Sequence, residues 1–293
     1  MRTFGLLTAC LAVVSAGNIA EELTAAGATT LVDLVVKAGL ADTVSTGGPF
    51  TVFAPTNEAF NKLPASLLAT LQSDIELLKK VLLYHVVSGE VYSKDITNDI
   101  TVDSVEGSKL RANIYLKSPY YPGFVTVNGV RVTKADHKAD NGVIHIVSDV
   151  IYPFPTGNIA EAVTADPRFS TLLAAVGAAG LAETLSGEGP FTVFAPTNEA
   201  FAKIPQDTLN GLLADKDALT KVLLRHVVPG TLYSKGIYWA EHKTAGGNEE
   251  DNVQTQVFKG GVTKVVSKTA GARVVDVDIP ATNGVIHAID TVI

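Results

Sequence analysis

The sequence predicts an α+β fold built twice, as two tandem domains in which helices come first and strands follow. The stretch PFTVFAPTNEAF at residues 49–60 recurs unchanged at residues 190–201, which is 141 residues later. Each copy then passes from segments with helical hydrophobic spacing to segments with alternating apolar residues and turn signals. A period this long exceeds that of a solenoid repeat and suits a domain that buries its own core.

Three further landmarks repeat in the same order at nearly the same spacing. They are GNIAE at residues 17–21 and 157–161, HVV at residues 85–87 and 226–228, and NGVIH at residues 141–145 and 283–287. We therefore assign one domain to residues 17–152, a short linker to residues 153–156 and a second domain to residues 157–293. The two prolines of the linker predict a semi-rigid spacer that restricts the angle between the domains.

The first sixteen residues have the features of a secretory signal peptide. Arg2 supplies a positive charge, residues 4–14 form a short apolar stretch, and small residues follow up to Ala16. Cleavage after Ala16 would start the mature chain at Gly17, where the first repeat begins. We therefore predict a signal peptide at residues 1–16, no membrane span, and a protein secreted to the extracellular space or the extracellular matrix.

Composition and motifs exclude several classes of function. The chain is 46% apolar and 18% charged with a net charge of −7, and no stripe of Lys and Arg could contact phosphates, which argues against nucleic acid. Cys10 is the only cysteine, and the run LTAC that ends at it imitates a lipidation site, but the apolar stretch continues beyond it. Zinc-protease, nucleophile-elbow and dinucleotide motifs do not occur in a suitable context. We therefore predict no enzyme, no cofactor and no metal site.

Each domain is expected to open with an amphipathic helix, because apolar residues recur at the i, i+3, i+4, i+7 spacing of one buried stripe. Gly39 and Gly180 follow these stripes and are expected to end the helices. The stripes consist of Leu31, Leu34, Val35 and Ala38 in the first domain and of Leu172, Leu173, Val176 and Ala179 in the second.

Capping and turn signals place the remaining elements. Residues 50–53 predict a short strand, and Thr56 is placed to cap the helix that follows. The run SDIE at residues 73–76 predicts a capping box with its serine as the N-cap of another helix. Asn128-Gly129 between two apolar runs predicts a hairpin with a type I′ turn. Strands in the later part of each domain indicate a mostly antiparallel sheet.

The repeated landmarks resemble the conserved boxes of the fasciclin (FAS1) domain family. Residues 51–60 resemble the first box, residues 141–151 resemble the second, and Tyr84-His85 resembles the tyrosine-histidine motif between them. Residues 226–234 are most similar to the midline fasciclin, periostin and transforming-growth-factor-induced group within this family. The resemblance implies two β-wedge domains packed with helices.

The same resemblance implies a non-catalytic adhesion or extracellular-matrix protein that binds cell-surface receptors such as integrins, matrix proteins or glycans. In the family, integrin binding is ascribed to the tyrosine-histidine motif and to an Asp-Ile pair ahead of the second box. The matching positions here are Tyr84 and His85, His226 of the second domain, and the pair Asp278-Ile279, for which the first domain has Asp136-His137 instead.

Each of these candidates also has a structural interpretation. A histidine at a helix end flanked by Leu and Val is typical of a buried cap that hydrogen-bonds the backbone, as expected for His85 and His226. Asp278 lies shortly before a proline and is equally typical of a turn. A second function also stays open, since the apolar composition and the carotenoid binding of some algal relatives suit a carrier of an apolar small molecule, either carotenoid or lipid.

Overall fold

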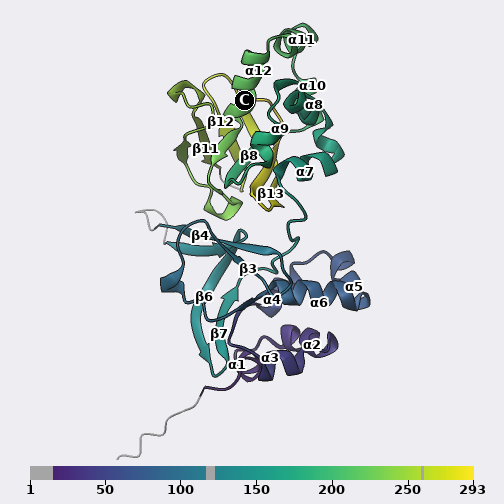
Figure 1. Ribbon diagram of the computed structural model, residues 1–293, viewed down its shortest axis with the longest axis vertical. Coiled ribbons are helices and arrows are strands. Elements are labelled where there is room, and N and C mark those ends of the chain that lie inside the picture. The colour runs from purple at the N-terminus through teal and green to yellow at the C-terminus, as the bar shows by residue number, and fades with distance from the viewer. Residues whose placement is uncertain (1–15, 117–122, 259–260) are drawn as a thin grey trace, which may run out of the picture.

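The computed structural model describes residues 16–116, 123–258 and 261–293 (Figure 1). Within these residues the strands form two seven-stranded sheets, one in domain 1 (residues 17–152) and one in domain 2 (residues 157–293). The two domains lie one above the other along the long axis of the molecule (Figure 1). The α+β fold with two tandem domains is confirmed. No helix in the described residues has the length and apolar character needed to cross a bilayer.

Domain 1 passes from helices to strands along the chain. Its helices are α1 (Ile19–Ala25), α2 (Thr29–Lys37), α3 (Ala41–Thr46), α4 (Asn57–Asn61), α5 (Ala65–Ser73), α6 (Ile75–Tyr84) and the 3-10 turn η1 (Ser93–Asp95). Its strands are β1 (Phe50–Pro55), β2 (Val86–Ser88), β3 (Ile100–Asp103), β4 (Lys109–Tyr115), β5 (Phe124–Val127), β6 (Val130–Ala139) and β7 (Gly142–Val147).

Domain 2 repeats this order. Its helices are α7 (Ile159–Ala165), η2 (Pro167–Phe169), α8 (Ser170–Ala179), α9 (Ala182–Ser186), α10 (Asn198–Ala202), α11 (Gln206–Ala214), α12 (Lys216–Arg225), η3 (Ser234–Gly236) and η4 (Glu249–Asp251). Its strands are β8 (Phe191–Pro196), β9 (Val227–Pro229), β10 (Ala240–His242), β11 (Val253–Val257), β12 (Thr263–Val266), β13 (Gly271–Ala281) and β14 (Gly284–Ile289).

Both sheets have the same topology. The strand order is β2-β1-β7-β6-β5-β4-β3 in domain 1 and β9-β8-β14-β13-β12-β11-β10 in domain 2. The pairs β1–β7 and β8–β14 are parallel and the other neighbours are antiparallel. In domain 1 the sheet curls until the Val105 N–H donates to the Val86 carbonyl at 2.7 Å, which brings the two edges together into a nearly closed wedge.

Each domain has one core between its helices and the sheet and another inside the wedge. In domain 1, Leu31, Leu78 and Ile144 belong to the helical core, whereas Phe53 and Leu110 belong to the core of the wedge. The strand β7 contributes to both, because residues on its two faces are buried. A strand that is buried on both faces has a nearly continuous apolar sequence, as the run NGVIHIV at residues 141–147 has.

Most of the predicted local signals are confirmed. Gly39 and Gly180 follow their helices with φ of 70° and 72°, the left-handed conformation that glycine adopts without strain. Thr56 caps α4 by accepting the Ala59 N–H at 3.2 Å. The hairpin between β5 and β6 turns at Asn128 and Gly129, both with positive φ, as a type I′ turn requires.

Two local predictions are wrong. The N-cap of α6 is Asp74, which accepts the Leu77 N–H at 2.9 Å, whereas Ser73 still belongs to α5 and donates to the Thr70 carbonyl at 3.1 Å. A capping aspartate one residue later therefore replaces the predicted box. Leu173 is 37% exposed, because α8 turns it away from the face on which Leu172 and Val176 are buried.

Candidate functional site

The tyrosine-histidine motif lies inside domain 1 at the end of α6. Tyr84 is fully buried, donates from its hydroxyl to the Lys109 carbonyl at 3.0 Å and accepts a hydrogen bond from the Asn128 amide. His85 is buried beside it; its Nδ1 lies 2.7 Å from the Val81 carbonyl, and its Nε2 accepts the Ile151 N–H at 2.9 Å. Through these hydrogen bonds His85 joins the C-terminal end of α6 to Ile151, near the end of domain 1.

His226 makes the same two contacts in domain 2. Its Nδ1 lies 2.8 Å from the Val222 carbonyl and its Nε2 accepts the Ile293 N–H at 3.0 Å. Burial lowers the pKa of both His85 and His226 to about 4, so both rings are neutral near pH 7. Because both ring nitrogens are engaged and the rings are buried, any effect of these histidines on binding acts through the fold.

Asp278 lies at a bulge in β13 with φ of 59°. Its carboxylate accepts the Ser234 N–H at 2.7 Å and a short bond from the Ser234 hydroxyl, and its own N–H donates to His287 Nδ1 at 3.3 Å. Ile279 follows it and packs against the helical core of domain 2. The side chain of Asp278 is only partly exposed, so it is a fixed feature of the surface rather than a mobile one.

Asp136 of domain 1 repeats this geometry although His137 follows it instead of isoleucine. It also has φ of 59°, its carboxylate accepts the Ser93 N–H at 2.8 Å, and its N–H donates to His145 at 3.2 Å. The two aspartates therefore have the same local role in their domains. They differ in what lies around them.

A polar junction that the sequence did not indicate joins the two domains. Asp99, with φ of 67°, lies just before β3 and forms an ion pair of 3.0 Å with Arg111 of β4. Its carboxylate also accepts the N–H of Thr231 from domain 2 at 3.0 Å and a short bond from the Thr231 hydroxyl. Asn113 donates to the Thr231 hydroxyl oxygen at 2.8 Å. Figure 1 shows β4 at the boundary with domain 2.

Aromatic residues complete this junction. The Tyr233 N–H donates to the Tyr115 hydroxyl at 3.3 Å, and the Tyr115 ring lies directly over Gly236, where a Cβ atom would come within 1.7 Å of it. Tyr233 is only 3% exposed, and its ring packs against Gly129 of the β5–β6 turn. The linker is also anchored, since Phe154 packs edge-on against Tyr84 at 5.7 Å between ring centres. The relative orientation of the domains is therefore fixed by direct contacts.

A cleft of about 290 Å³ lies beside this junction. Clefts of this size at domain boundaries are common binding sites. Although partial burial opposes ionisation, hydrogen bonds from Lys62 and Ser148 keep the pKa of the Asp149 carboxyl below its usual value. The cleft is lined by Asn128, Asp149 and Tyr152 of domain 1 and by Tyr233, Lys235 and Asp278 of domain 2. Of the predicted site residues, only Asp278 lines it.

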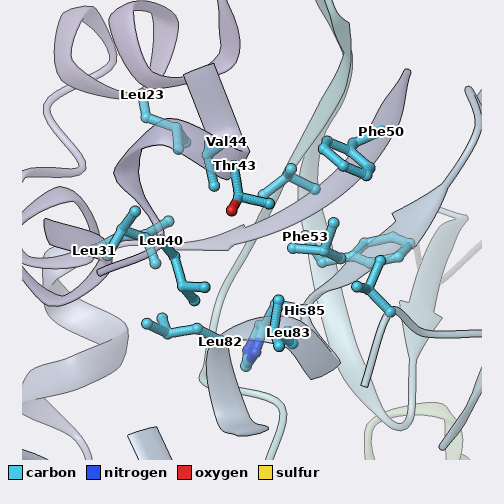
Figure 2. Close-up of a pocket in the computed structure, with 14 residues that line it drawn as sticks. Leu23, Leu31, Leu40, Thr43, Val44, Phe50, Phe53, Leu82, Leu83 and His85 are labelled. Carbon is cyan, nitrogen blue, oxygen red and sulfur yellow. The ribbon is translucent and has the colours of Figure 1, made fainter. Parts of the chain in front are cut away.

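An apolar pocket in domain 1 bears on the carrier hypothesis (Figure 2). Side chains from the first helices, from β1 and from the end of α6 surround it, among them Leu31, Phe50, Leu82 and His85. Its cavity volume is about 30 Å³, which is close to the space of one water molecule. A carotenoid or a lipid chain would need a much larger cavity than this pocket, so the pocket does not support the carrier hypothesis, which stays a prediction.

Comparison with known proteins identifies the family. The fasciclin domain family matches residues 26–153 and again residues 167–293. This chain belongs to the fasciclin domain family. The two matches fall on the two sheets described above, so each sheet with its helices is one fasciclin domain.

Two of the similar proteins are much longer than this chain, which spans less than half of their length. It is 36% identical over 286 residues to the transforming growth factor-beta-induced protein ig-h3 of Sus scrofa, a match that covers 96% of this chain and 40% of that protein. It is 30% identical over 285 residues to periostin of Homo sapiens, covering 92% of this chain and 30% of periostin. A solved FAS1 domain pair from the insect cell adhesion molecule Fasciclin I is 21% identical with a TM-score of 0.44, covering 92% of this chain and 97% of that one.

Proposed function

We propose that this chain is a secreted, non-catalytic adhesion protein that binds a cell-surface receptor, such as an integrin, or a component of the extracellular matrix. Its relatives transforming growth factor-beta-induced protein and periostin are adhesion and matrix proteins of the same domain family. The observation that carries the proposal is the cleft between the domains, because it places the Asp278 carboxylate among groups from both fasciclin domains.

The Asp278 carboxylate suits an integrin in chemical terms. Integrins bind ligands through a divalent cation, and hard cations prefer carboxylate oxygens. Ser234 occupies one acceptor direction on each oxygen of Asp278, but a carboxylate has about four such directions, so it can accept these bonds and still reach a cation. The bonds from Ser234 also hold the carboxylate in one orientation, which lowers the entropy lost on binding.

Cell attachment to the immobilised protein tests the proposal, and the chain offers a matched control. Asp278→Asn removes the negative charge but keeps a side-chain oxygen that can accept from Ser234, and asparagine also tolerates the positive φ at this position. Asp136→Asn makes the same change at the equivalent position of domain 1. We expect Asp278→Asn to reduce attachment several-fold and Asp136→Asn to leave it unchanged, with similar melting temperatures for both. Equal losses in the two variants, or attachment that resists chelation of divalent cations, would exclude this binding mode.

Secretion is proposed from the predicted signal peptide, whose residues 1–15 lie outside the described part of the chain. The Gly17 N–H donates to the Glu22 carboxylate at 2.8 Å, and Asn18 caps α1. Cleavage after Ala16 would turn the Gly17 nitrogen into an ammonium group, which could form an ion pair with that carboxylate. Mass spectrometry of protein from the culture medium is expected to give a chain beginning at Gly17; a chain that keeps Met1 would contradict it.

A further inference from the structure

The duplication allows each surface of domain 2 to be compared with its counterpart in domain 1. Strand pairing sets the correspondence, since Ile100 pairs with Ala112 in domain 1 as Ala240 pairs with Thr255 in domain 2. Counting from these pairs, Asp99 corresponds to Trp239, and Tyr115 corresponds to Phe258. The same count matches Arg111 and Asn113 with Gln254 and Gln256.

In domain 1 this surface is covered by domain 2. We call Asp99, Arg111, Asn113 and Tyr115 the docking face. Asp99, Asn113 and Tyr115 contact residues 231–236 of domain 2, and Arg111 donates to the Thr282 carbonyl of domain 2 at 3.5 Å. We call residues 231–236 the docking segment. In this chain, the face beside β3 and β4 of domain 1 therefore binds a loop of the other fasciclin domain.

In domain 2 the corresponding face is exposed and aromatic. Trp239, the only tryptophan in the sequence, is 64% exposed, and Phe258 is 40% exposed with its ring centre 6.3 Å from that of Trp239. The Lys264 ammonium lies 5.2 Å from the centre of the Phe258 ring. We call these three residues the aromatic face. Large aromatic side chains grouped on a surface with a charged rim are typical of protein interfaces.

Domain 1 in turn carries an unused counterpart of the docking segment. The equivalence is direct, because Thr51 accepts the Val91 N–H at 2.8 Å just as Thr192 accepts the Leu232 N–H at 2.8 Å. Residues 90–95 therefore match residues 231–236, and Tyr92 matches Tyr233. Tyr233 is buried against domain 1, whereas Tyr92 is partly exposed and donates its hydroxyl to Glu90 at 2.9 Å.

We propose that the aromatic face of one copy binds residues 90–95 of a second copy, so that chains associate head to tail. Tyr92 would pack against Trp239 and Phe258, and Lys264 would face the acidic Glu90 and Asp95. The exchange of Asp99 for Trp239 matters here, because Glu90 stands where Thr231 stands in domain 2. A glutamate would be repelled by Asp99 but tolerated by an indole, so a second copy does not compete with the contact inside the chain.

The contact between copies cannot reproduce the contact within the chain in every detail. Gly236 leaves room for the Tyr115 ring, whereas Asp95 occupies the matching position in domain 1. Phe258 would therefore lie beside Asp95 rather than over it. The association is heterologous, since the two surfaces differ, and such contacts extend into open chains or close into rings, unlike the single isologous contact of a two-fold dimer.

Two single variants of the full secreted chain test this arrangement by sedimentation from about 1 μM to about 1 mM, the range in which weak association saturates. Trp239→Ala removes the centre of the aromatic face, and Tyr92→Ala removes the side chain expected to contact it. We expect the mass of the wild type to rise with concentration and each variant alone to stay monomeric. An equimolar mixture of the two should form dimers, because each variant keeps the surface that the other lacks.

Fluorescence gives an independent readout, because Trp239→Ala contains no tryptophan. Titrating Trp239→Ala into Tyr92→Ala should shift the Trp239 emission of the second variant to shorter wavelength. Val36→Ser is the control: it alters an exposed apolar residue of α2 outside both surfaces, and it should associate as the wild type does. If the wild type stays monomeric over the whole concentration range, the proposal is overturned, and the aromatic face would then be free to bind a receptor or a glycan instead. Association of Tyr92→Ala alone also overturns the proposal, because it would mean that two aromatic faces bind each other.

Discussion

The two buried histidines show how much of this fold depends on single side chains. His85 and His226 each join the last turn of a helix to the last residues of their domain through both ring nitrogens. Only a neutral ring can accept an N–H at one nitrogen while donating from the other. Their protonation would therefore break a bond at the place where the chain leaves each domain.

We expect the protein to lose stability as the pH falls from about 6.5 to about 4. Burial depresses the pKa of each ring to about 4 in the folded state, against 6.5 for a histidine exposed to water, so the unfolded chain binds protons first. The stabilisation is complete above pH 6.5 and lost toward pH 4, on the order of 3 kcal/mol for each histidine. Urea unfolding at a series of pH values measures it.

Proton titration by NMR separates the histidines from the carboxylates. The imidazoles of His85 and His226 should show no titration between pH 7 and pH 5. His226→Asn should reduce the pH dependence of the stability of domain 2. Burial opposes ionisation of the Asp149 carboxyl, but hydrogen bonds from Lys62 and Ser148 keep its pKa below the ordinary 3.8. The contribution of this carboxylate to stability is therefore lost at a lower pH than that of the histidines. Titration of either imidazole near 6.5 would mean that the ring reaches solvent and could contact a partner.

At the scale of elements, two asparagines hold the first helix of each domain against its sheet. Asn283 accepts the Ile159 N–H of α7 at 2.8 Å and donates to the carbonyls of Leu185 and Gly187 at 2.9 and 2.7 Å. Asn141 makes the corresponding contacts with α1 and the end of α3. A side chain that bridges a helix, a loop and a strand serves both domains in the same way.

We expect Asn283→Ala to destabilise domain 2 by on the order of 3 kcal/mol, because it leaves three backbone groups without partners in a largely buried site. Urea unfolding followed by circular dichroism should show domain 2 unfolding earlier while domain 1 is unchanged. Asn210→Ala is the control, since Asn210 lies on the exposed surface of α11, where its side chain accepts a hydrogen bond from Gln206 at 3.0 Å. If Asn283→Ala lowers the free energy of unfolding no more than Asn210→Ala does, water replaces these hydrogen bonds without a loss of stability.

Local signals in the sequence predicted the elements better than the contacts between them. Asn128-Gly129 and Thr56 act within a few residues, so the turn and the cap could be recognised from spacing alone. The same reasoning identified NGVIH at residues 283–287 only as a repeated landmark and missed the hydrogen bonds of Asn283 to α7 and α9. Those bonds join residues about 100 positions apart, and the sequence gives no sign of such contacts.

At the scale of the whole molecule, the duplication predicts two similar bodies but not how they meet. The docking face of domain 1 contacts a different part of domain 2, so the similarity of the two domains does not define the contact. Asp99 and Thr231 are 132 residues apart in the chain, and a lone aspartate before a strand is ordinarily a turn residue. The cleft that contains Asp278 exists only because these surfaces meet, which is why only one of its residues was recognised.

Gly236→Ala is expected to separate the two domains while leaving each core intact. The added methyl group would lie 1.7 Å from the Tyr115 ring, which must swing away and release its bond to Tyr233. Small-angle scattering should therefore show a larger radius of gyration, and attachment of cells should fall because the cleft is lined by both domains. Gly211→Ala is the matched control, since a Cβ at that position in α11 meets no atom of the described residues within 4 Å apart from its own helix backbone and chain neighbours.

A double variant distinguishes loss of the junction from damage to domain 2. Tyr115→Ala added to Gly236→Ala removes the clash, and the Asp99, Arg111 and Thr231 bonds remain available to hold the domains together. We expect the double variant to recover a radius of gyration close to that of the wild type. If Gly236→Ala alone scatters like the wild type, the junction tolerates the displaced ring, and the polar bonds of Asp99 suffice to orient the two domains.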